Sequence, residues 1–150
     1  MIDIERILLE IEALPSDKQV SLQTNDVNIK DHLVGTGRPI KMKEFDFIHP
    51  LFDLTYINEL MKEMKLYRTR IMRMPPKSCY SLHKDFSLRL HIPLVTNEKC
   101  FLVIDNEVIR YPADGNFYIL NAKKEHTAVN ASLKERIHLI ACVKDEDYRA

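Results

Sequence analysis

A strong net charge, a cysteine framework and long apolar runs are all missing from this sequence. Lysine plus arginine number 22, as do aspartate plus glutamate, so the formal net charge is zero. Such a chain lacks the global field that draws a protein to nucleic acid or to an anionic membrane, and we expect neither partner. The short basic run Arg68, Arg70 and Arg73 is typical of a solvated strand face.

Disulfide, zinc-ribbon and targeting patterns are absent as well. The three cysteines are far apart and form no CxxC pair. The N-terminal residues lack the basic region of a secretory signal or a transit peptide. No apolar run approaches the roughly 20 residues that cross a bilayer. These absences predict a soluble protein of the reducing cytoplasm.

The N-terminal part of the chain, residues 1–66, is expected to be helical and irregular. One helix is predicted from about 53 to 65, with Asp53 as its N-cap. At 150 residues the chain has the length of a single domain, and we expect its helices to pack outside the core. The first fourteen residues also predict a helix, because apolar residues recur there at helical spacing: Ile4, Ile7, Leu8 and Ile11.

From residue 67 onward, short segments rich in β-branched, aromatic and aliphatic residues follow one another. Asp105-Asn106 signals a tight hairpin between two of them. Eight short strands within 67–143, with no helix between them, predict a mainly β fold, either a double-sheet jelly roll or a barrel. The predicted strands are 67–74, 79–82, 87–95, 100–104, 107–111, 116–121, 126–130 and 135–143.

A candidate metal site lies within this β region. His83-Lys84-Asp85 is the only His-x-acid triplet in the chain. In an extended segment, residues i and i+2 project to the same side, so His83 and Asp85 can face one ion. His126 begins a later predicted strand. Two histidines and one carboxylate are the ligand set of non-haem iron(II) oxygenases.

Other polar residues are candidates for the surrounding pocket. Arg136 follows His126 by ten residues, and its planar guanidinium suits the remote carboxylate of a dicarboxylate cosubstrate. Arg89 and His91 alternate with leucines, so their face is either a solvated outer face or the lining of the barrel mouth. Among the tyrosines, Tyr80 is the best candidate for a pocket residue, because it lies three residues before His83. We expect His138 to be a paired core residue and not a ligand.

At these residues the sequence resembles the aspartyl/asparaginyl β-hydroxylase branch of the 2-oxoglutarate- and iron(II)-dependent dioxygenases. The resemblance runs from roughly residue 70 to residue 143 and rests on the combination of its parts, since each part alone is common. The stretches that carry it are Arg73-Met74-Pro75-Pro76 through His83-Lys84-Asp85, Leu88 to Leu94, His126-Thr127-Ala128-Val129-Asn130, and Arg136-Ile137-His138-Leu139.

The resemblance implies a double-stranded β-helix in which iron is bound by three residues: His83, Asp85 and His126. It also implies that Arg136 pairs with the distal carboxylate of 2-oxoglutarate and that Arg89 and His91 are placed to contact this cosubstrate. The reaction would use O2, convert 2-oxoglutarate to succinate and hydroxylate an amino acid, a peptide side chain or a lipid, since the fold does not fix the substrate.

Two alternatives stay open at this point. The first is a cupin-like metal enzyme that does not use 2-oxoglutarate. The second is a non-catalytic β-barrel binding module in which His83 and His126 are only hydrogen-bonded. The sequence also leaves open whether the chain forms a homodimer through its N-terminal helix.

Overall fold

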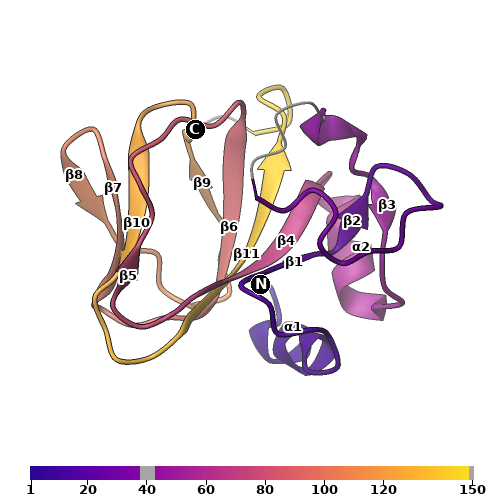
Figure 1. Ribbon diagram of the computed structural model, residues 1–150, viewed down its shortest axis with the longest axis horizontal. Coiled ribbons are helices and arrows are strands. Elements are labelled where there is room, and N and C mark those ends of the chain that lie inside the picture. The colour runs from indigo at the N-terminus through magenta and orange to yellow at the C-terminus, as the bar shows by residue number, and fades with distance from the viewer. Residues whose placement is uncertain (38–42, 149–150) are drawn as a thin grey trace.

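The computed structural model describes residues 1–37 and 43–148, and it is mainly β. A five-stranded antiparallel sheet, in the order β1-β4-β11-β6-β9, faces a four-stranded sheet, β5-β10-β7-β8 (Figure 1). Strands β2 and β3 form a separate pair. In chain order the elements are α1 (Ile4–Ile11), β1 (Gln19–Ser21), β2 (Gln23–Thr24), the 3-10 helix η1 (Glu44–Asp46), β3 (His49–Pro50), α2 (Thr55–Glu63), β4 (Tyr67–Met74), β5 (Ser78–Cys79), β6 (Leu88–Val95), β7 (Cys100–Ile104), β8 (Glu107–Ile109), β9 (Tyr118–Leu120), β10 (His126–Asn130) and β11 (Arg136–Val143).

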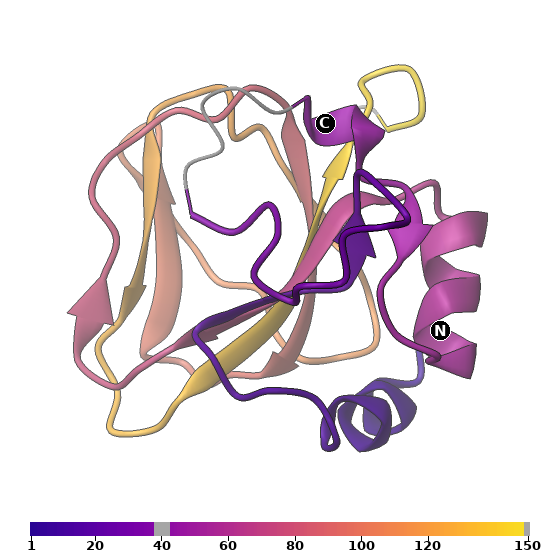
Figure 2. The ribbon, with the colours of Figure 1, turned by 45° about the vertical axis from the view of Figure 1, so that its right-hand side comes forward.

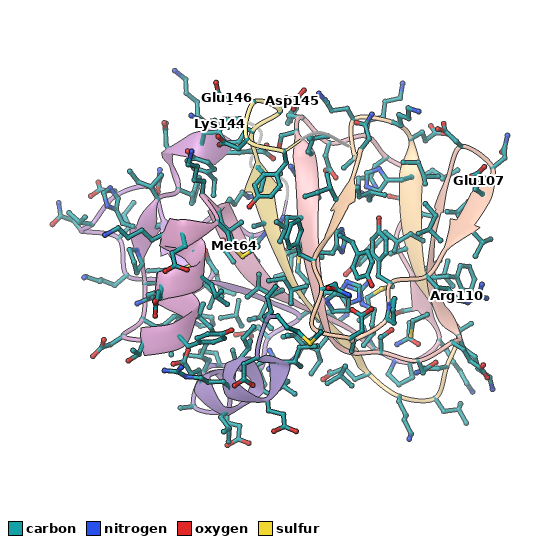
Figure 3. The ribbon with its side chains drawn as sticks, turned by 180° about the vertical axis from the view of Figure 1, so that it is seen from behind. Met64, Glu107, Arg110, Lys144, Asp145 and Glu146 are labelled. Carbon is teal, nitrogen blue, oxygen red and sulfur yellow. The ribbon has the colours of Figure 1, made fainter. Side chains whose placement is uncertain are left out.

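Strands β4 to β11 form the double-sheet jelly roll that the sequence predicts. The chain crosses between the sheets repeatedly, so that β4, β6, β9 and β11 lie in the larger sheet and β5, β7, β8 and β10 in the smaller one (Figure 2). Seen from behind, Glu107 and Arg110 mark the β8 edge of the smaller sheet (Figure 3). Met64, the C-cap of α2, lies nearer the middle of the molecule, beside the helix.

The predicted hairpin at Asp105-Asn106 is confirmed. Ile104 of β7 pairs with Glu107 of β8, so the loop has two residues. Both loop residues have positive φ, 51° at Asp105 and 60° at Asn106. This is the backbone of a type I′ turn, whose twist matches that of the strands that it joins.

Both helices cover the outer face of the larger sheet, as expected (Figure 1). Ile7 of α1 and Ile57 of α2 are fully buried in one core with Leu90 of β6 and Leu139 of β11. The apolar stripe of each helix therefore docks on its own chain.

The prediction that Asp53 caps α2 is wrong, because Leu54 occupies the N-cap and makes no side-chain cap. The carboxylate of Glu10, in α1, instead accepts hydrogen bonds from the backbone N–H groups of Tyr56 and Ile57, each at 2.9 Å. A carboxylate is stabilised by unpaired N–H groups at a helix N-terminus, whichever element supplies it.

Strand boundaries differ most in the segment that leads to His83. The predicted strand 79–82 is represented by β5, Ser78–Cys79, and the chain from Tyr80 onward is irregular. Part of the irregular stretch expected before α2, residues 38–42, lies outside the described residues. Among the described residues, no helix is both long enough and apolar enough to cross a membrane.

The packing between helices and sheet predicts a large cost for truncating Leu90, which is 0% exposed. Leu90→Ala should lower the free energy of unfolding by about 2–5 kcal/mol, measured by urea denaturation. The control Val108→Ala, at a side chain 53% exposed, should change it by less than about 0.5 kcal/mol. Equal effects of the two substitutions would contradict this core.

Candidate metal centre

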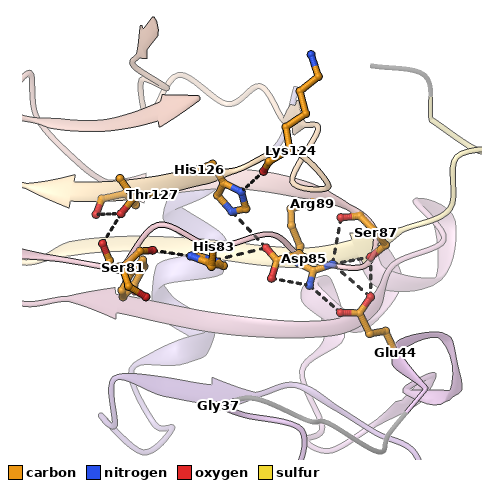
Figure 4. Close-up of polar contacts among 12 residues, drawn as sticks. Gly37, Glu44, Ser81, His83, Asp85, Ser87, Arg89, Lys124, His126 and Thr127 are labelled. Carbon is orange, nitrogen blue, oxygen red and sulfur yellow. Dashed lines mark hydrogen bonds and ion pairs between the residues drawn. The ribbon is translucent and has the colours of Figure 1, made fainter. Parts of the chain in front are cut away.

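Two backbone segments bring the three predicted ligands together. His83 and His126 form an isolated antiparallel bridge, in which each N–H donates to the other's carbonyl, at 3.1 and 3.0 Å. The Asp85 N–H donates to the Ala122 carbonyl at 2.8 Å, which fixes the segment that follows His83. The three side chains consequently point toward one another (Figure 4).

The ligand atoms of His83, Asp85 and His126 all lie within 4.8 Å of one another. Asp85 Oδ2 is 3.2 Å from His126 Nε2 and 3.7 Å from His83 Nε2. Ligands at about 2.1 Å from an ion, in adjacent octahedral positions, lie about 3 Å apart. The cluster therefore has nearly the dimensions of a divalent metal site.

A hydrogen bond at Nδ1, the ring nitrogen that faces away from Asp85, orients each imidazole. His83 Nδ1 lies 2.7 Å from the Ser81 carbonyl, and His126 Nδ1 lies 2.8 Å from the Lys124 carbonyl. Because a carbonyl oxygen only accepts, both Nδ1 atoms are the N–H donors. Both Nε2 atoms then face Asp85. A protonated Nε2 donates to the carboxylate, whereas a bound metal would take the Nε2 lone pair, as in many metal-binding histidines.

The Asp85 carboxylate is ionised at neutral pH. Burial by itself raises its pKa, but the hydrogen bond with His126 and the charge of Arg89 outweigh burial and lower the pKa to about 2. Arg89 Nη2 lies 3.4 Å from Oδ1, whereas Oδ2 faces the imidazoles. One oxygen is thus engaged by the guanidinium and the other remains for a metal, so the residues fit a two-histidine, one-carboxylate site.

Glu44, which no sequence motif marked, holds Arg89 in this position. Arg89 Nη2 donates to Glu44 Oε1 at 2.7 Å, and Arg89 Nη1 reaches Oε2 at 3.3 Å. Ser87 donates to the same carboxylate at 2.7 Å, and Arg68 Nη1 reaches it at 3.3 Å. A buried carboxylate between two guanidiniums thus holds Arg89 beside Asp85. Figure 4 shows the contacts of Glu44 with Arg89 and Ser87.

The triad opens into a cavity of about 720 Å³, which the predicted pocket residues also line: Tyr80, Arg89, His91 and Arg136. The polar face of β6 is therefore cavity lining and not a solvated outer face. Whether Arg89 or His91 contacts a cosubstrate stays a prediction; Arg89 already pairs with Glu44 and Asp85.

The expectation that the basic run lies on a solvated strand face is wrong for Arg68 and Arg70. Both are buried and line the cavity. The prediction failed because the inner face of β4 turns toward the cavity, while its outer face packs in the helix-covered core through residues such as Ile71. Arg73, near the end of the strand, is partly buried beside Glu135.

His138 lies outside the metal cluster, in a buried contact with His91 at 3.1 Å between their Nδ1 atoms. Burial and the charge of Arg136 lower the pKa of His91 to about 3 and that of His138 well below its usual value. Both imidazoles are consequently neutral, and in one Nδ1 donates while in the other it accepts.

Comparisons with known proteins identify a family whose sequence model matches this chain. The sequence model of the aspartyl/asparaginyl beta-hydroxylase family matches residues 53–145.

Solved structures that are similar to this chain include cupins. The plu4264 protein from Photorhabdus luminescens is 16% identical (TM-score 0.43), and the match covers 53% of this chain and 63% of that one, which is less than two thirds. A cupin domain from Bordetella pertussis is 19% identical (TM-score 0.45), and the match covers 51% of this chain and 80% of that one. A predicted oxalate decarboxylase from Thermotoga maritima is 18% identical (TM-score 0.45), and the match covers 57% of this chain and 72% of that one.

The cluster predicts binding of a divalent metal that depends on its three side chains. In calorimetry with manganese(II), His126→Ala and Asp85→Ala should each weaken binding by more than about tenfold, because an open site has few ligands to lose. The control His32→Ala removes a histidine that pairs with Asp17 away from the cluster and should leave the affinity unchanged. Metal binding that survives both ligand substitutions would refute the assignment.

The Glu44 network predicts a pH dependence of stability. Burial alone raises the Glu44 pKa, but Arg89, Ser87 and Arg68 together lower it below 4.5. Its stabilising contribution is therefore complete above about pH 4.5 and is lost as the pH falls through the lower, folded-state pKa.

Glu44→Gln should lower the free energy of unfolding at pH 7 by about 3–5 kcal/mol, because two buried guanidiniums lose their partner. Its stability should also fall less steeply in acid than that of the unmodified protein. Urea denaturation at pH 7 and below pH 4.5 measures both effects. Glu59→Gln, at an exposed position on α2, is the control, and a Glu44→Gln variant as stable as this control would contradict the network.

Proposed function

The chain belongs to the aspartyl/asparaginyl beta-hydroxylase family, and we propose that it is an oxygenase that uses iron(II), O2 and 2-oxoglutarate to hydroxylate a small molecule or a peptide. The family and the three-residue metal cluster support a metal-dependent, oxygenase-like function. The observation that carries the finer proposal is that the cavity containing the triad also contains Arg136, a buried guanidinium without an acidic partner among the described residues.

The proposed reaction is balanced by the two organic substrates. One atom of O2 is inserted into a substrate C–H bond, and the other enters the carboxylate of succinate as 2-oxoglutarate loses CO2. The C–H bond and the 2-oxoacid each contribute two electrons, which together reduce O2. Iron(II) bound by His83, Asp85 and His126 would supply open coordination positions for the cosubstrate and for O2.

Arg136 is suited to bind the far carboxylate of 2-oxoglutarate. Its side chain is 2% exposed, and neither Nε nor Nη2 has a hydrogen-bond partner. Burial lowers the pKa of Arg136, but a guanidinium remains charged at neutral pH. An unpaired buried charge is costly, and a carboxylate that accepts two N–H bonds from the planar group would remove that cost.

The rest of the cavity orients the reactants and limits water. Neutral His91 offers a hydrogen-bonding group without adding another charge beside Arg136. Leu102, Leu120 and Ala128 contribute apolar lining. Arg89 holds Asp85 so that one carboxylate oxygen faces the two histidines. Such preorganisation lets a metal site direct its oxidising power to a bound substrate.

Succinate production tests the proposal. The purified protein with iron(II), ascorbate and O2 should convert 2-oxoglutarate to succinate slowly without the hydroxylation substrate, as measured by mass spectrometry. His126→Ala should abolish this turnover. Arg136→Met should weaken 2-oxoglutarate binding by more than about tenfold, because it removes a charge-assisted pair, and should change manganese(II) affinity by less than about twofold.

His32→Ala is again the matched control and should keep full turnover. Metal binding without any succinate formation would favour a cupin-like enzyme that does not use 2-oxoglutarate. Absence of metal binding at micromolar concentrations would favour a non-catalytic binding module. Either result contradicts the proposal.

A further inference from the structure

The cavity contains a second buried guanidinium without an acidic partner, Arg70 of β4. Its side chain is 6% exposed, and Nε has no hydrogen-bond partner among the described residues. Nη1 donates to Gln19 Oε1 at 3.2 Å, which is a neutral contact. Residues 38–42 and 149–150 contain no aspartate or glutamate, so those segments supply no acidic side chain either.

The chain neutralises other buried arginines of the same cavity. Arg68 and Arg89 share the Glu44 carboxylate, and Arg89 also contacts Asp85. Arg70 forms no ion pair with a described residue. Burial and the charge of Arg68 lower the pKa of Arg70 to about 10, which still leaves it charged at neutral pH. The unpaired charge is therefore specific to Arg70 and Arg136.

The two arginines start from different rows of the larger sheet. On β11, Arg136 is paired in register with Met74, and Ile140 is paired with Arg70. Four residues of a strand correspond to about 13 Å between the two rows. Arg70 shares its row with His91, the partner of Ile140 on β6, and Arg89 lies two residues before His91. The backbone of Arg70 thus lies nearer to Arg89, which contacts Asp85, and the backbone of Arg136 lies at the other end of β11.

A count of charges leaves one site for an additional anion. Four arginines line the cavity, and Glu44 and Asp85 are the buried or half-buried acids among its described lining residues. If the distal carboxylate of 2-oxoglutarate occupies Arg136, Arg70 alone remains without an anion. A bound divalent metal would only add to this positive excess.

We propose that Arg70, assisted by Gln19, binds a carboxylate of the hydroxylation substrate, which is therefore a small acid. The unpartnered Nε side of the guanidinium fits the two oxygens of a carboxylate, and the Gln19 contact fixes its orientation. Leu82 and Phe86 are largely exposed and line the same cavity, so the remainder of the substrate is apolar. This inference rests on the proposed function, in which 2-oxoglutarate is bound at Arg136.

Pairs of acids and their carboxamides test this inference. Hexanoate, 4-phenylbutyrate and N-acetyl-leucine are each compared with the matching amide by calorimetry. The protein is loaded with manganese(II), which keeps it inactive, and is titrated with and without saturating 2-oxoglutarate. At least one acid should bind more than about tenfold tighter than its amide when 2-oxoglutarate is present, because only the acid pairs with the guanidinium.

Arg70→Met should reduce that preference to less than about twofold and leave 2-oxoglutarate affinity intact, since the substitution removes the charge but keeps the length. Lys18→Met removes an exposed cation beside Gln19 and should keep the preference. If Arg70→Met does not fold, Arg70→Lys retains the charge without the planar fork and should retain only part of the preference.

Three results would overturn the inference. The unmodified protein could show no preference for any acid, or the preference could persist in the Arg70 variants. Arg70→Met could also weaken 2-oxoglutarate as strongly as Arg136→Met does, which would assign Arg70 to the cosubstrate. By contrast, a protein that prefers acids through Arg70 but does not bind 2-oxoglutarate would support this site and refute the proposed function.

Discussion

The candidate metal centre depends on one backbone contact, the antiparallel bridge between His83 and His126. His83 lies in an irregular segment after β5, and His126 begins β10, so no local sequence pattern places the two residues together. Two reciprocal hydrogen bonds fix the two Cα positions, and the i, i+2 geometry after His83 then brings Asp85 to the same side. A shift in this pairing would separate the ligands even if every strand of the jelly roll remained intact.

The larger sheet separates two environments that the sequence interleaves residue by residue. On one face, Leu90 and Leu139 pack against the helices, and on the other, His91 and Arg136 line the cavity. The apolar face supplies stability that does not depend on a ligand. The cavity face carries several buried positive charges, and Glu44 neutralises only a part of them.

Local periodicity explains what the sequence could predict. The bounds of β4, β7 and β10 match the predicted strands, because alternation and turn residues are local signals. The cluster of His83, Asp85 and His126 could be predicted because two of its members share one His-x-Asp triplet. Glu10 at the N-terminus of α2 and Glu44 beside Arg89 were not, since each acts on a segment far along the chain. The burial of Arg70 was missed for the same reason: which face of a strand meets a cavity is decided by the opposite sheet.

Binding and stability are coupled in such a cavity. Buried guanidiniums without carboxylates raise the free energy of the empty folded state, and an anion that binds only this state lowers it again. The same low-polarity surroundings that make Arg70 and Arg136 costly when unpaired strengthen their attraction for a carboxylate. The two arginines start from different rows of the larger sheet, and each has an Nε without a hydrogen-bond partner. The unpaired charges of this cavity therefore favour anionic ligands over neutral ones of the same shape.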